Sequence, residues 1–70
     1  MTTKDIRVLY GEKLKDFRKK KGLSQEELGF KSSLHRTYIS EVERGRRNIS
    51  IVNIAKIAKA LGMKVKDFFD

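Results

Sequence analysis

The stretch GLSQEELGFKSSLHRTYISEVERGRRNIS, residues 22–50, carries the start signal of a short helix. Ser24 and Glu27 have the spacing of a capping box, in which each side chain accepts a hydrogen bond from the other residue's backbone N–H. A helix is therefore predicted from Ser24 to about Lys31. Gly29 lies inside it and costs about 1 kcal/mol relative to alanine, which indicates a close approach of another helix at that point.

A tight turn and a further helix follow this one. Residues 32–34, Ser-Ser-Leu, have weak helix propensity and predict the turn, and the next helix runs from Arg36 to Arg44 before Gly45 ends it. Ile39 and Val42 share one side of this helix. The opposite side carries hydrogen-bonding groups: Arg36, Thr37, Ser40, Glu41 and Arg44. By itself that pattern fits an ordinary solvated face or a helix in the major groove of DNA, where such groups meet base edges.

Apolar stripes predict helices on both sides of this region. The first helix spans about Lys4 to Lys21, and its stripe consists of Ile6, Leu9, Tyr10, Leu14 and Phe17. Ser50 caps a fourth helix, whose stripe consists of Ile51, Ile54, Ile57, Ala58 and Leu61. A short last helix carries Val65, Phe68 and Phe69. The prediction is an all-α fold, a compact five-helix bundle that forms one domain over residues 1–70.

Charge and composition narrow the class of function. The chain has 17 Lys+Arg against 9 Asp+Glu, a net charge of +8, which favours nucleic acid as a partner before an anionic membrane, with plain solubility as the ordinary alternative. Cysteine is absent and His35 is the single histidine, so no metal or cofactor is expected and His35 is predicted as a helix N-cap. Because no apolar segment resembles a signal peptide or the roughly 20 residues of a membrane span, a soluble, unprocessed chain is expected.

Two short helices joined by a tight turn are the arrangement of a helix-turn-helix, and the residues carry a resemblance. LSQEEL, TYISEVERG and the later IAKALG resemble the helix-turn-helix of the phage repressor and Cro-like (XRE) family of bacterial DNA-binding regulators. Within that family, SSLHRTYISEVERGRRNISI most resembles the controller proteins of restriction-modification systems. The chain departs from the family pattern at Gly29, where alanine is usual, and at Ile49, where many members have proline.

The resemblance implies that the polar face of the third predicted helix reads bases in the major groove. The residues concerned are Arg36, Thr37, Ser40 and Glu41. Arg36 is the first candidate, because an arginine can donate two hydrogen bonds to guanine O6 and N7. Thr37 and Ser40 suit base or phosphate contacts, with plain solvation as the alternative, and Glu41 suits either cytosine N4 or a solvated helix surface. Arg47 is a further candidate for reaching a base.

A second set of residues is expected to contact the DNA backbone. Gln25 stands at the N-terminus of the second predicted helix, a position that favours anions. Tyr38 lies at the edge of the apolar face, where its ring can pack while its hydroxyl reaches a phosphate. The remaining candidates flank the third helix and could clamp the backbone: Arg44, Arg46, Arg47 and Asn48.

One short recognition helix per chain predicts a symmetric homodimer on a pseudo-palindromic operator, with half-sites about 34 Å apart. The apolar load at the C-terminal end makes Val65, Phe68 and Phe69 candidates for the dimer contact, and filling the monomer core is the alternative for them. Association of two copies would double the specific contacts that one recognition helix can make.

The predicted function is sequence-specific regulation of transcription in the cytoplasm of a bacterium, on its nucleoid. Double-stranded operator DNA is the expected partner. RNA polymerase is a further candidate partner, and no membrane is expected to be involved. The residues offer no nucleophile, base and orienter arranged for catalysis, which speaks against an enzyme. The alternative is a protein-interaction module of the same fold, such as an antitoxin, because fold does not settle function.

Overall fold

The structure, a computed structural model, describes residues 5–69 as a chain of helices. In order they are α1 (Ile6–Lys20), α2 (Gln25–Ser32), α3 (Arg36–Glu43), α4 (Ile51–Ala60) and the 3₁₀ turn η1 (Val65–Phe68). The all-α prediction is confirmed, but the count of five helices is wrong because the last element is a single 3₁₀ turn. The predicted helix start at Lys4, the interpretation of the extreme N-terminus and the domain limits 1 and 70 lie outside the described residues.

The predicted helix caps are confirmed. The Glu27 N–H donates to Ser24 Oγ at 3.0 Å and the Ser24 N–H donates to Glu27 Oε1 at 2.9 Å, which completes the capping box. That backbone hydrogen bond lowers the pKa of Glu27. The stability that the ionised Glu27 carboxylate contributes is therefore present above the ordinary glutamate pKa and is lost as the pH falls through the lowered pKa. At α3, His35 Nδ1 accepts from the Thr37 N–H at 3.1 Å, so His35 is the N-cap.

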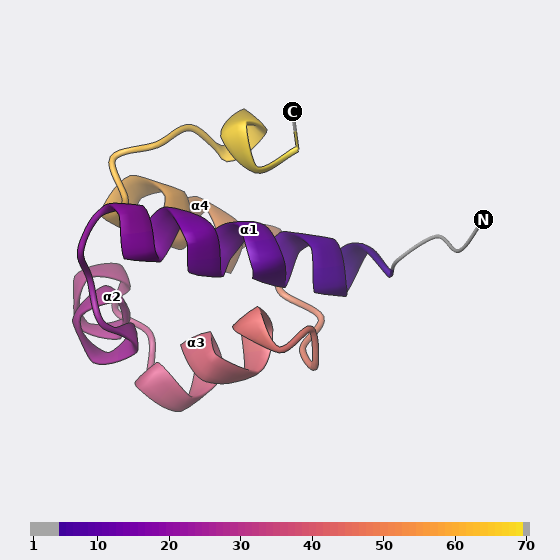
Figure 1. The fold of residues 1–70 in the computed structure, drawn as a ribbon, viewed down its shortest axis with the longest axis horizontal. Coiled ribbons are helices and arrows are strands. Elements are labelled where there is room, and N and C mark those ends of the chain that lie inside the picture. Colours follow the sequence, from indigo (N-terminus) through magenta and orange to yellow (C-terminus); the bar gives the residue numbers. More distant parts are fainter. Residues whose placement is uncertain (1–4, 70) are drawn as a thin grey trace.

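Helix α1 crosses the middle of the molecule in the view of Figure 1, and it packs against α3 and η1. In this view α2 and α3 lie on one side of α1, α4 lies behind it, and the C-terminal loop with η1 lies on the other side. The core that they enclose consists of Tyr10, Leu14, Leu28, Ile39, Val42, Ile57, Ala58, Leu61 and Phe68. This packing buries one side of α3 and leaves its other side at the surface.

The start of α4 departs from the predicted apolar stripe. Ile51 was expected on the buried side, but it is 78% exposed, and its neighbour Val52 is 60% exposed. Ile57 and Ala58, farther along the helix, are buried as expected. The predicted stripe therefore reaches the core only from Ile54 onward, since Ile54 packs against the core residues and Ile51 does not.

Two glycines allow helices to approach each other closely. A Cβ built at Gly29 would lie 2.7 Å from the Leu34 carbonyl oxygen, which confirms the predicted close approach at the turn between α2 and α3. A Cβ at Gly11 would meet the carbonyl oxygen of Val42 and lie 2.8 Å from that of Glu43. Gly11 therefore lets α1 lie directly against the C-terminal end of α3.

Gly11→Ala tests whether this contact is needed. The methyl group has no flexible side chain to displace, only the α3 backbone, so we expect the free energy of unfolding to fall by about 1–3 kcal/mol and the melting temperature to fall by about 4–8 °C per kcal/mol. Thermal melting followed by circular dichroism measures it, with Lys15→Ala, on the exposed side of α1, as the control. A stabilisation of about 1 kcal/mol, which helix propensity alone predicts, would show that α1 and α3 do not touch here.

Candidate nucleic-acid interface

The polar face of α3 is at the surface, as predicted. Ile39 and Val42 are 0% and 1% exposed, which anchors the helix to the core. On the other side the Arg36 and Thr37 side chains are exposed, and Ser40 and Glu41 are half-buried. The first five residues of α3 therefore present a guanidinium and two hydroxyl groups, those of Arg36, Thr37 and Ser40, from a helix whose position is fixed by packing.

Glu41 and Arg47 form an ion pair at the edge of this face. Arg47 Nε donates to Glu41 Oε1 at 2.8 Å, and the Arg47 guanidinium carbon lies 5.1 Å from the centre of the Tyr38 ring. Tyr38 Oη in turn accepts a hydrogen bond from Asn53 Nδ2 of α4 at 3.0 Å. Three residues predicted to contact DNA are thus gathered in one network with Asn53. Exposed pairs of this kind contribute little to stability, so DNA phosphates can compete for Arg47.

Gln25 joins a buried ion pair beneath the surface. Arg18 of α1 donates to both carboxylate oxygens of Glu43 of α3, from Nε to Oε2 at 2.6 Å and from Nη2 to Oε1 at 3.0 Å. The Arg18 and Glu43 side chains are only 10% and 3% exposed. Hydrogen bonding to Glu43 raises the pKa of Arg18 above its ordinary value. Gln25 Nε2 donates to Glu43 Oε1 at 3.1 Å, so the amide predicted to bind phosphate also touches this pair.

The other predicted backbone contacts follow the end of α3. Arg44 and Arg46 are exposed, and the Arg46 N–H donates to the Glu41 carbonyl oxygen at 3.0 Å. Asn48 instead lines a cavity of about 180 Å³ whose wall includes Ile6 and Phe69. Arg44 and Arg46 thus extend the cationic edge of α3, and Asn48 lies beside the apolar side of the molecule.

The C-terminal aromatic residues divide into a buried one and an exposed one. Phe68 is 1% exposed, stacks on Tyr10 at a centroid distance of 4.9 Å and meets Phe17 edge-on at 5.1 Å. The prediction of Phe68 as a dimer residue is therefore corrected. Its ring fills the monomer core and leaves no surface for a partner. Phe69 is 51% exposed and Val65 36%, so these two predicted dimer residues reach the surface.

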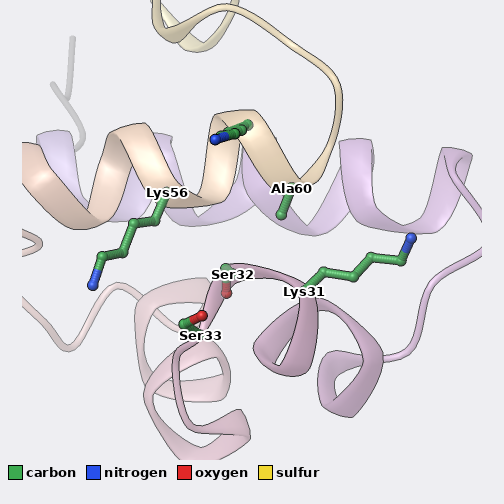
Figure 2. A pocket seen from close by; sticks show the side chains of 6 residues that line it. Lys31, Ser32, Ser33, Lys56 and Ala60 are labelled. Atoms are coloured by element: carbon green, nitrogen blue, oxygen red, sulfur yellow. The ribbon is translucent and has the colours of Figure 1, made fainter.

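A second basic surface lies at the other end of α2. An open cavity there is lined by Lys31 and Ser32 of α2, by Ser33 of the turn and by Lys56, Lys59 and Ala60 of α4 (Figure 2). The Lys31 and Lys56 side chains extend away from one another, so their ammonium groups do not converge on one point. Lys31 and Lys59 also belong to the last turns of their helices, where cations complement the helix dipole. These lysines therefore have an ordinary structural role.

The described residues offer neither a metal-binding cluster nor a membrane-spanning helix. Within residues 5–69, no group of three or more His, Asp or Glu side chains lies close enough together to hold a metal ion. None of the helices described is long and apolar enough to cross a membrane.

Sequence reasoning missed Arg18, Glu43 and Asn53. A signal for the first two exists, because each lies four residues after a buried apolar residue of its own helix, Leu14 or Ile39, and so shares its inner face. Charged residues at such positions are usually assigned to a solvated edge. Asn53 carries no comparable signal, since an asparagine in the first turn of a helix is common.

Comparison with known proteins gives the family. The helix-turn-helix family model matches residues 14–68. The control protein C.BamHI of Bacillus amyloliquefaciens is 54% identical over 69 residues, which cover 97% of this chain and 85% of that protein, and C.MunI of a Mycoplasma species is 46% identical over 93% and 89%. The crystal structure of the restriction-modification controller protein C.AhdI from Aeromonas hydrophila superposes with a TM-score of 0.89 at 49% identity, over 90% of this chain and 96% of that one. The chain therefore belongs to the helix-turn-helix family and groups there with the restriction-modification controller proteins.

Proposed function

We propose that this protein binds operator DNA as a homodimer and regulates the transcription of a restriction-modification system. The observation that carries the proposal is the exposed polar face of α3, headed by Arg36, on a helix whose other face is completely buried. A rigid helix that presents arginine and hydroxyl groups matches the donors and acceptors of base edges in the major groove. Arg36, Thr37 and Ser40 are the base-reading residues of this proposal.

Charge supports contacts to the DNA backbone around that face. The net charge is +8, and Arg44, Arg46 and Arg47 follow one another at the C-terminal end of α3. In the free protein Arg47 is neutralised by Glu41. On DNA we assign Arg44 and Arg46 to phosphates, and Arg47 to a phosphate or a base once it leaves Glu41.

The dimer uses the apolar side of the molecule. Ile6, Leu9 and Phe69 are exposed, and all three border one cavity between α1 and η1. The Tyr10 hydroxyl in its wall is buried without a hydrogen-bond partner among the described residues, and burial raises the pKa of Tyr10. Exposed apolar side chains around a concave surface are typical of an association site. A second copy of the chain would cover them.

In this proposal the protein is a regulator and not an enzyme, because it acts only by binding to DNA. Its place of action is the nucleoid in the cytoplasm. Where it activates transcription, RNA polymerase is its further partner.

Arg36→Ala tests base reading. An arginine that binds a guanine with two hydrogen bonds contributes about 1–3 kcal/mol of discrimination, so the variant should bind the operator about 5- to 150-fold more weakly and random DNA nearly as well as the parent. Fluorescence anisotropy with both duplexes measures this, and Lys15→Ala, which removes the same charge from α1, is the control. Equal losses on the two duplexes would make Arg36 a phosphate contact.

Arg46→Ala tests the backbone contact. Affinity should fall by a similar factor on operator and random DNA, and the slope of log K against log salt should become shallower by about one. Titrations at several salt concentrations give the slope. If the slope does not change, Arg46 lies outside the interface. Binding that does not depend on salt at all would favour a protein-interaction module.

Phe69→Ala and Phe68→Ala together test the dimer surface. Phe69→Ala should shift sedimentation toward the monomer and weaken operator binding while the helical circular dichroism signal is retained. Phe68→Ala should instead lose stability by about 3–5 kcal/mol, because a buried aromatic ring is removed from a small core. A Phe69→Ala variant that is still fully dimeric at micromolar concentration would place the dimer surface elsewhere.

A further inference from the structure

Gln25 is held from behind by a buried carboxylate. Its Nε2 lies 3.1 Å from Glu43 Oε1, the same oxygen that accepts from Arg18 Nη2 at 3.0 Å. Arg18 also donates from Nη1 to the Leu23 carbonyl oxygen at 2.8 Å, and so fixes the loop that leads into α2. One ion pair therefore bonds both the loop that leads into α2 and the Gln25 side chain at the first residue of α2.

The carboxylate also determines which way round the Gln25 amide is turned. A carboxylate only accepts hydrogen bonds, so the amide must direct its NH₂ group, and not its oxygen, to Glu43. One N–H of that NH₂ group is used by Glu43. The other remains able to donate to a phosphate, which also only accepts. With the opposite orientation the carboxylate would face the amide oxygen, and the two acceptors would repel each other.

We propose that Glu43 is a positioning residue for DNA binding. Arg18 holds the Glu43 carboxylate in place, and the carboxylate holds the Gln25 amide ready to donate to a DNA phosphate. This inference rests on the proposed DNA-binding function. Glu43 itself does not touch DNA, since its side chain is 3% exposed. Its effect is to remove the rotamer freedom that a free glutamine loses on binding.

The contact differs in kind from those of the neighbouring arginines. Arg44 and Arg46 are exposed and charged, so each contact that they make with a phosphate releases a counterion and depends on salt. Gln25 is neutral, so a hydrogen bond from its amide to a phosphate adds to the affinity without releasing a counterion. Loss of the Gln25 contact should therefore weaken operator and random DNA alike without changing the salt slope, which separates it from loss of an arginine contact.

The test is a double-mutant cycle in two backgrounds. The first is the parent protein, and the second carries Arg18→Met with Glu43→Leu, which replaces the ion pair by apolar side chains of similar volume and leaves the net charge unchanged, a kind of replacement that proteins often tolerate. Gln25→Ala is then introduced into each, circular dichroism verifies folding, and binding to operator and random duplexes is measured. We expect Gln25→Ala to weaken both duplexes about 3- to 10-fold in the parent, and less than about 2-fold in the apolar background.

The outcomes distinguish this inference from the proposed function. If Gln25→Ala costs the same in both backgrounds, the contact does not depend on Glu43 and the inference is overturned, while DNA binding stands. If Gln25→Ala has no effect in the parent, Gln25 is not a contact and the inference also fails. If the parent itself does not prefer any duplex and its binding does not depend on salt, the proposed function fails.

A second variant covers a loss of folding in the apolar background. Glu43→Asp keeps a negative charge opposite Arg18 but withdraws the carboxylate by one methylene group, away from Gln25. We expect it to show the same 3- to 10-fold loss, which Gln25→Ala does not increase further. Side-chain amide NMR of Gln25 gives an independent readout, because the amide should be ordered in the parent and mobile in Glu43→Asp. An amide that is equally ordered in both would contradict the positioning role.

Discussion

The buried ion pair between Arg18 and Glu43 is the interaction on which the arrangement of the helices depends. It joins α1 to the C-terminal end of α3 by two hydrogen bonds and reaches α2 through Gln25. Replacing both partners by apolar residues is often tolerated, but removing one partner of such a pair leaves a buried charge and costs about 3–5 kcal/mol. The main effect of the pair is therefore not stability. It fixes the relative positions of the C-terminal ends of α1 and α3 and the N-terminal end of α2.

The helix-turn-helix is fixed at both ends by different means. At the turn, the Leu34 carbonyl oxygen lies so close to Gly29 that a Cβ there would be 2.7 Å away. At the open end, Gln25 of α2 is bonded to Glu43 of α3. Between these points Ile39 and Val42 anchor α3 in the core. A helix held in this way can present Arg36 without reorganisation, and a preformed surface lowers the entropic cost of binding.

Local sequence signals predicted most of this fold, because they depend on residues close together in the chain. The capping box at Ser24, the N-cap at His35 and the close approach at Gly29 were all predictable, as was the outward direction of Arg36. What the sequence did not reveal depends on residues far apart: Arg18 and Glu43 are separated by 25 positions, and nothing local says that they meet. The burial of Phe68 and the exposure of Ile51 likewise depend on how η1 and α4 pack, which periodicity alone does not determine.

If α3 reads base edges from a symmetric dimer, selection of bound duplexes from a random DNA pool should enrich a pseudo-palindrome whose half-sites lie about one helical turn, or a multiple of it, apart. The parent and Arg36→Ala should enrich different bases at one position of each half-site. A pool in which no sequence is enriched, or in which a single asymmetric half-site is enriched alone, would show that α3 does not read DNA in this way.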